Sequence, residues 1–223
     1  MRFKNRQQAA GFLAERLIQY KGQKPLILGI PRGAMPMAKI IADTLEGEMD
    51  VVLVHKLGAP DNPELAVGSV DEFGRVYLGE QARALGLRDA DIRAEKARQM
   101  ETLHRRRAWY TPVYPAINPA ARLVIIVDDG IATGASMIAA LRAVRAKRPK
   151  KLIAATAVAA YQSLLKIQKL ADEVVCLEVP ENFYAVGQFF DEFKQVSDEE
   201  VIALLQQSRS DFERTKSSDG KPS

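Results

Sequence analysis

Residues 123–136, LVIIVDDGIATGAS, place two adjacent carboxylates directly after an apolar run and then open a glycine-containing turn. The run at 123–128 lacks polar alternation, which is typical of a strand covered on both faces of a sheet. Residues 135–147 carry apolar side chains at helical spacing, which predicts a helix after the turn. In open parallel sheets, ligands bind beyond the carboxyl ends of strands, so this acidic tip is the first candidate site.

The rest of the chain repeats this unit of strand and helix. Short apolar runs predict strands and longer amphipathic stretches predict helices, which together favour βαβ units. We therefore expect an α/β fold, an open, mostly parallel twisted sheet flanked by helices, in one domain over residues 1–207. The expected strands are residues 25–30, 51–56, 123–128, 152–158 and 173–179, and the expected helices are residues 5–22 (N-cap Asn5), 34–45, 135–147 and 162–170.

Residues 57–119 break this rhythm and are expected to form an insertion. The segment KLGAPDNPELAVG (56–68) is rich in proline and glycine, which predicts a loop, and GSVDEFGRVYLGE (68–80) predicts a hairpin. A helix is expected over residues 89–110. The arginines at 105–107 are interpreted as a solvated face of that helix.

The C-terminal region is expected to end in one helix and a tail. Ser197 and Glu200 have the spacing of a capping box, which predicts that a helix begins there. Residues 208–223 are polar and are expected to be a flexible tail.

The composition fits a folded domain and excludes several classes of protein. The chain has 223 residues, 47% of them hydrophobic, and its 32 Lys and Arg against 28 Asp and Glu leave a net charge of only +4, which does not by itself imply nucleic acid. A lone cysteine, Cys176, forms no internal disulfide and is expected to lie in a buried strand. His55 and His104 lack the spacing of a zinc site. No signal peptide or long apolar span is evident, so we expect a cytoplasmic protein without a membrane partner.

The acidic tip and the turn have complementary chemistry. Carboxylates accept hydrogen bonds, so Asp128 and Asp129 suit the vicinal hydroxyls of a sugar. The turn from Gly130 to Ser136 carries little side-chain bulk, and its amides can surround a phosphate at a helix N-terminus, with hydroxyls from Thr133 and Ser136. The alternative is a strand-ending turn followed by an ordinary helix cap.

The segment VIIVDDGIATGAS (124–136) resembles the phosphoribosyl-diphosphate binding motif of type I phosphoribosyltransferases, with serine at its last position where threonine is common. The resemblance implies that Asp128 and Asp129 are catalytic and contact the ribose hydroxyls. It implies that the following loop binds the 5-phosphate of the donor, through Gly130, Ile131, Ala132, Thr133, Gly134, Ala135 and Ser136.

Two further segments resemble parts of the same family that bind pyrophosphate. GIPRGAMPMA (29–38) places Arg32 and Gly33 in the position of the pyrophosphate loop, and the resemblance implies a cis peptide between Pro31 and Arg32. VHKLGAP (54–60) places Lys56 just before a mobile loop, from which Glu64 could face the site. The alternatives are a turn with a surface arginine and a solvated lysine at a strand end.

The segment ENFYAVGQFFDEF (181–193) resembles the hood of purine phosphoribosyltransferases, expected here over residues 180–193. The resemblance implies that Tyr184 stacks on the base and that Asp191 reaches Mg²⁺ or its waters. The alternative is that the aromatic residues of this segment are core residues. The segment CLEVPE (176–181) lacks an evident base-reading lysine, so the acceptor stays open.

Together these segments predict a phosphoribosyltransferase that uses Mg²⁺. It would transfer 5-phosphoribosyl from phosphoribosyl diphosphate to a nitrogenous base or amine and release pyrophosphate, and the resemblance implies a homodimer. The alternative hypothesis is a regulatory protein of the same fold that binds RNA or DNA through the basic surface around residues 104–107. The acids interleaved in that helix argue against a nucleic-acid partner.

Overall fold

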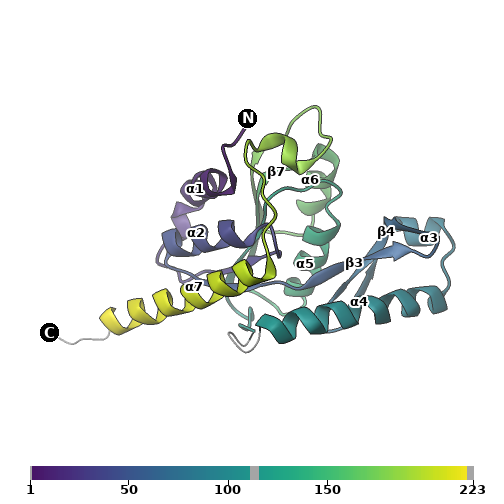
Figure 1. Ribbon diagram of the computed structural model, residues 1–223, viewed down its shortest axis with the longest axis horizontal. Coiled ribbons are helices and arrows are strands. Elements are labelled where there is room, and N and C mark those ends of the chain that lie inside the picture. The colour runs from purple at the N-terminus through teal and green to yellow at the C-terminus, as the bar shows by residue number, and fades with distance from the viewer. Residues whose placement is uncertain (1, 111–115, 220–223) are drawn as a thin grey trace.

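The computed structural model describes residues 2–110 and 116–219. Its main sheet has five strands in the order β2-β1-β6-β7-β8, and all neighbouring strands run parallel (Figure 1). The predicted α/β class with an open parallel sheet is therefore confirmed. The strands are β1 (Leu26–Gly29), β2 (Glu48–Val51), β6 (Leu123–Asp128), β7 (Lys151–Val158) and β8 (Glu173–Glu178).

Helices cover both faces of this sheet, as Figure 1 shows. Alternate residues of β6 explain the arrangement: Ile125 and Val127 pack in the core beneath α1 and α2, whereas Val124 and Ile126 pack beneath α5 and α6. All four residues are 0% exposed, so both faces of this part of the strand are covered and no polar alternation is needed. The helices are α1 (Arg6–Arg16), α2 (Met35–Leu45), α5 (Ala135–Arg145) and α6 (Tyr161–Ile167).

The first predicted helix is shorter than expected. The side chain of Asn5 accepts from the amide of Gln8 at 3.0 Å, so the predicted N-cap is confirmed. The α-helix ends at Arg16, and a 3₁₀ turn, η1 (Ile18–Tyr20), continues the chain.

The prediction of one strand over residues 51–56 was wrong. β2 ends at Val51, and β3 (Val54–Ala59) belongs to a second, antiparallel sheet with β4 (Asn62–Asp71) and β5 (Val76–Leu78). The predicted loop at 56–68 is therefore mostly strand. The physical reason is cross-strand pairing: β3 and β4 hydrogen-bond along most of their length, and Val67 and Val70 are buried.

The hairpin predicted at 68–80 is confirmed as β4 and β5. Asp71 stabilises the turn, because its Oδ1 accepts from the amides of Phe73 and Arg75, each at 2.9 Å. A short helix, α3 (Glu80–Ala84), follows β5, and the long helix α4 (Asp89–Tyr110) has the predicted bounds. The small sheet and α4 extend away from the main sheet as an arm (Figure 1).

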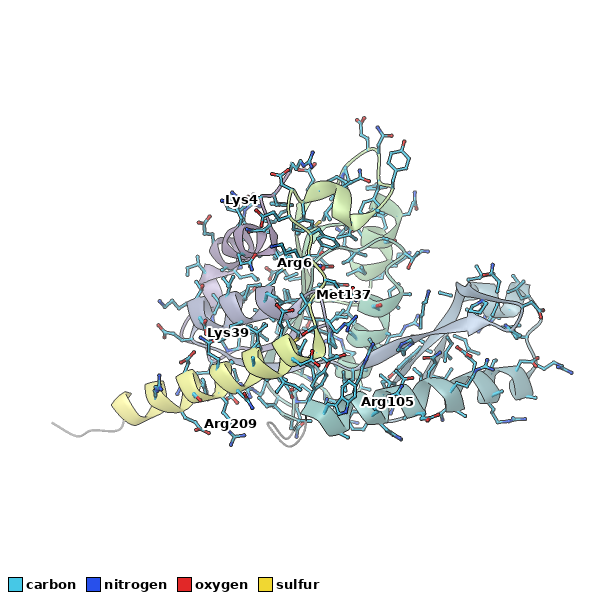
Figure 2. The ribbon with its side chains drawn as sticks, viewed as in Figure 1. Lys4, Arg6, Lys39, Arg105, Met137 and Arg209 are labelled. Carbon is cyan, nitrogen blue, oxygen red and sulfur yellow. The ribbon has the colours of Figure 1, made fainter. Side chains whose placement is uncertain are left out.

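The arginines of α4 do not form one solvated face. Arg105 is exposed on the arm (Figure 2), but Arg107 is largely buried and donates to both carboxylate oxygens of Glu72 at 2.6 Å. A bidentate pair of this kind fixes the helix against the turn after β4. The prediction of a solvated face is thus wrong for Arg107.

Asp50, in the edge strand β2 of the main sheet, is a buried acid whose pKa is raised. It is 2% exposed and accepts from the amides of Val51 at 2.7 Å and Ile117 at 2.8 Å, and Arg107 Nη1 lies 3.8 Å from its Oδ1. Burial raises the pKa of Asp50 to about 6, against the lowering influence of these amides and of Arg107.

The raised pKa of Asp50 predicts a pH dependence of stability. The folded state binds its proton more tightly than the unfolded state, so stability falls as pH rises from about 4 to about 6. Relative to Asp50→Asn, the free energy of unfolding of the natural protein should fall by about 2–3 kcal/mol between pH 4 and pH 7. Urea unfolding of both proteins across this range measures it, and a constant difference would contradict the prediction.

The last helix, α7 (Asp198–Asp219), begins at the predicted capping box, in which Ser197 and Glu200 exchange side-chain hydrogen bonds. The helix continues to residue 219 and therefore includes most of residues 208–223, the segment expected to be a flexible tail. Lys39 of α2 explains this: its buried ammonium binds Asp43 at 2.6 Å and Asp211 at 2.9 Å, which ties α7 to the core. Residues 220–223 lie outside the described chain.

Candidate site at the carboxyl ends of β1 and β6

The strand order creates a crevice between β1 and β6. After β1 the chain passes through α2 to β2 on one side, and after β6 it passes through α5 to β7 on the other side. The two strands therefore lie at the point where the strand order reverses, which is where open parallel sheets bind ligands. Two predicted site segments follow these strands directly.

Those segments meet at the crevice. A Cβ added to Gly33, in the turn after β1, would lie 2.3 Å from Oδ2 of Asp129, at the end of β6. Only glycine permits so close an approach of the backbone to the carboxylate. The peptide between Pro31 and Arg32 is cis, as the resemblance implies. The structure thus brings Arg32, Gly33 and the acid pair together.

The acid pair is strongly desolvated. Asp128 Oδ1 accepts from the amide of Asp129 at 3.0 Å. Burial, and then the charge of Asp129, raise the pKa of Asp128 well above its ordinary value. Burial also raises the pKa of Asp129, although the Arg6 guanidinium opposes that rise. Two neighbouring carboxylates in such a place can be ionised together only with cations or hydrogen-bond donors beside them.

The loop after the acid pair opens toward solvent at the N-terminus of α5. Thr133 and Ser136 are exposed, and Gly134 has a φ of 80° as the residue before the helix, a conformation that suits glycine. The amide of Ile131 donates to Val158 at 2.8 Å. That amide is therefore already engaged, whereas the first turn of α5 is the kind of helix terminus that can bind an anion.

The hood packs directly on this loop. Its 3₁₀ turn, η2 (Val186–Phe189), approaches Gly130 so closely that an added Cβ there would lie 2.3 Å from the Val186 side chain. Phe189 and Phe190 are buried, so for them the alternative of core aromatics is correct. Tyr184 is 86% exposed, and the structure places it outside the cavity described next.

A cavity of about 390 Å³ adjoins the acid pair, and Arg6 is one of its lining residues that no sequence motif had indicated. Arg6 lies against Asp129 although 122 residues separate them. The sequence placed Arg6 only within the helix expected over residues 5–22. A basic residue in an amphipathic helix carries no signal of a buried ion pair, so pattern alone could not have found it. The lining consists of Arg6, Arg32, Gly33, Asp129, Phe193, Lys194, Gln195 and Val196.

Arg32 is held at this cavity by a chain of polar contacts. Its Nη1 lies 3.3 Å from Oδ2 of Asp198, the first residue of α7, and Oδ1 of that carboxylate accepts from the hydroxyl of Tyr110 at 2.8 Å. Tyr110 is fully buried at the end of α4, and burial raises its pKa. The arm and the last helix therefore both help to place Arg32.

The structure does not bring every predicted residue to the acid pair. Lys56 lies in β3 opposite Ser69, within the small sheet. The carboxylate of Asp191 forms an ion pair of 2.6 Å with Arg2, and both side chains are more than half exposed. The side chain of Glu64 lies outside the described part of the structure.

Fold and site together define an α/β protein with an acidic, glycine-rich crevice at the reversal of its strand order, the place where open parallel sheets generally bind ligands. The model of the phosphoribosyl transferase domain matches residues 2–194. The chain belongs to this family. No helix among residues 2–110 and 116–219 is long and apolar enough to cross a membrane.

Two kinds of relative accompany the family match. Rv0571c of Mycobacterium tuberculosis, which is provisionally named a phosphoribosyl transferase, is 39% identical over 211 residues, covering 94% of this chain and 48% of the relative. The chain thus spans about half the length of the curated relatives it matches. The crystal structure of TT1426 from Thermus thermophilus is 42% identical, with a TM-score of 0.82 and coverage of 93% of this chain and 99% of that one.

Proposed function

We propose that the protein transfers 5-phosphoribosyl from phosphoribosyl diphosphate to a nitrogenous acceptor and releases pyrophosphate. The observation that carries the proposal is the contact between Gly33 and Asp129, which joins the turn after β1 to the acid pair after β6. A sugar that carries a diol and two phosphate groups fits these neighbouring elements. Membership of the family supports the same reaction.

Each element has a distinct role in this proposal. Asp128 and Asp129 accept hydrogen bonds from the ribose hydroxyls, and their charge favours the cationic sugar as it develops, so they act most strongly in the transition state. The loop from Gly130 to Ser136 holds the 5-phosphate at the N-terminus of α5. Arg32 offsets the charge of the departing pyrophosphate, and we propose the same role for Lys56 once the donor is bound.

Mg²⁺ is the cofactor that we propose. Among the described residues no cluster of three or more metal-ligating side chains is present. We propose that the ion is held mainly by substrate phosphates and water, with few carboxylates, as is usual for Mg²⁺ at phosphate sites. When bound, Mg²⁺ supplies charge neutralisation for the leaving pyrophosphate. The proposed contribution of Asp191, through water, requires that its ion pair with Arg2 open.

The structure gives the nucleic-acid hypothesis no specific support. Two basic residues of α4, Arg98 and Arg107, are paired with acids, which interrupts any basic stripe that phosphates could follow along this helix. Arg98 binds Glu95 at 2.5 Å and Arg107 binds Glu72 at 2.6 Å. Arg88, just before the helix, binds Asp91 at 2.9 Å. We therefore propose no second function.

A pyrophosphate-release screen tests the proposed function. Phosphoribosyl diphosphate and Mg²⁺ are incubated with purines, pyrimidines, pyridine carboxylates and simple amines, with EDTA as the metal-free arm. Release that depends on one acceptor and stops with EDTA is expected. If no acceptor elicits release and calorimetry detects no donor binding, the proposal is wrong. Sedimentation on the same preparation tests the proposed homodimer.

The ion pair between Arg32 and Asp198 predicts a change in donor affinity. Asp198→Asn keeps an acceptor for Tyr110 but removes the charge that holds the guanidinium, so we expect a roughly three- to tenfold rise in KM for the donor with a smaller change in kcat. Glu15→Gln removes the same charge from an exposed residue of α1 and serves as control. Equal KM values for both variants would contradict the prediction.

A further inference from the structure

Arg6 is a buried arginine in the cavity, and no motif of the sequence assigns it a role. It is the first residue of α1 and is 8% exposed. Its Nε and Nη2 both lie 2.8 Å from Oδ2 of Asp129, and its Nη1 donates to the carbonyl of Lys194 at 2.6 Å. One guanidinium therefore joins the acid pair to the segment that follows the hood.

An aromatic ring restricts the same guanidinium. Its Cζ lies 3.8 Å from the centroid of the Phe193 ring, and Phe193 is itself stacked on the buried Phe190 with a centroid distance of 5.0 Å. A planar guanidinium that packs on a ring and donates along its edge has one well-defined orientation. A carboxylate, a carbonyl and an aromatic ring thus all hold Arg6.

The position of Arg6 also suits the charge of the site. A buried carboxylate pair needs a neighbouring cation if both acids are to serve as hydrogen-bond acceptors. Arg6 provides that cation by direct contact with Asp129. Its positive charge also acts to lower the pKa of Asp128, to which it makes no hydrogen bond. Its Nη2 would lie 3.2 Å from a Cβ added to Gly33, so the guanidinium also borders the turn after β1.

We propose that Arg6 is a positioning residue, which orients the Asp129 carboxylate toward the ribose hydroxyls of the donor and couples that carboxylate to the segment that follows the hood through the carbonyl of Lys194. The inference rests on the proposed function, because the donor is the ligand whose binding it improves. Arg6 acts through Asp129 and does not itself contact the donor.

Calorimetry with phosphoribosyl diphosphate and Mg²⁺ tests this inference in three variants. Arg6→Gln should weaken donor binding about tenfold or more, and Arg6→Lys should recover part of the loss, because lysine keeps the charge but not the planar fork. Arg16→Gln removes the same charge at the exposed end of the same helix and should stay within about twofold of the natural protein. Thermal unfolding checks that each variant is folded. If Arg6→Gln does not fold, the comparison of Arg6→Lys with the natural protein tests the inference.

A double-mutant cycle with Asp129→Asn separates positioning from direct contact. In the Asp129→Asn background, Arg6→Gln should weaken donor binding by less than about twofold further, because the residue through which it acts has been altered. A further loss of about tenfold would overturn the inference, because Arg6 would then contact the donor independently.

Two other outcomes are also decisive. A folded Arg6→Gln variant that binds the donor like the natural protein overturns the inference and leaves the proposed function standing. A natural protein that shows no donor binding overturns the proposed function, and the inference with it, before any variant is measured.

Discussion

Replacing Asp128 and Asp129 together by asparagine is expected to reduce turnover at least ~1,000-fold while the protein remains folded. Asparagine keeps the shape of each side chain but removes the charge that favours the developing cationic sugar. The fold should survive, because burial raises the pKa of both acids, so their ionised forms cost stability rather than support it. Pyrophosphate release and thermal unfolding measure the two effects.

A matched control removes two charges elsewhere. Glu15 and Asp89 are exposed on α1 and α4, and Glu15→Gln combined with Asp89→Asn should leave turnover within about twofold of the natural protein. Undiminished turnover in the double variant of the acid pair would refute the assignment of these acids.

The same acids predict how activity depends on pH. The pKa of Asp128 is raised by burial and by repulsion from Asp129, and the ionised form is the one that acts. Turnover should therefore decline as pH falls through the titration of the pair and recover as pH rises.

Gly33→Ala is expected to weaken donor binding and turnover about 100-fold, because a misplacement of about 1 Å in a binding turn has effects of this size. The new Cβ would lie 2.3 Å from Oδ2 and 3.1 Å from Cγ of Asp129. That carboxylate cannot yield easily, because Arg6 holds it at 2.8 Å. Either the turn after β1 or the acid must therefore move. Calorimetry with the donor and Mg²⁺ measures the loss.

Gly11→Ala is the control for this substitution. Gly11 lies within α1, and a Cβ added there would have no atom within 4 Å apart from those of its chain neighbours and the nearby backbone of its own helix. Alanine should stabilise the helix by about 0.5–1 kcal/mol and leave donor binding unchanged. If Gly33→Ala binds the donor as well as Gly11→Ala does, the turn after β1 is not part of the donor site.

The sequence pattern predicted one strand correctly and another wrongly. The apolar run that ends at Asp128 predicted its own strand, because both faces of β6 are covered by helices. The apolar pattern at 51–56 wrongly predicted a single strand. The chain leaves one sheet after Val51 and enters another at Val54, and no polar residue separates the two strands. A short apolar run does not state which sheet it joins.

The long-range contacts had no local signal at all. Asp198 is an acid in the first turn of α7, and no sequence pattern marked it, yet it contacts both Tyr110 and Arg32. Asp191 matched a family position by spacing, yet its carboxylate pairs with Arg2. Side-chain partners of this kind depend on how separate helices and loops pack, and spacing along the chain does not encode them.

The sequence by itself determined the α/β class, the acidic tip of β6, the glycine turn into α5 and the helix bounds of α4, because each depends on periodicity or on residues adjacent in the chain. Only the tertiary structure decided that Arg6 binds Asp129, that Arg107 is buried against Glu72, and that α7 continues past residue 208 on the ammonium of Lys39. The physical reason is that buried ion pairs form where desolvated groups from distant segments meet, and that meeting depends on the packing of the whole chain.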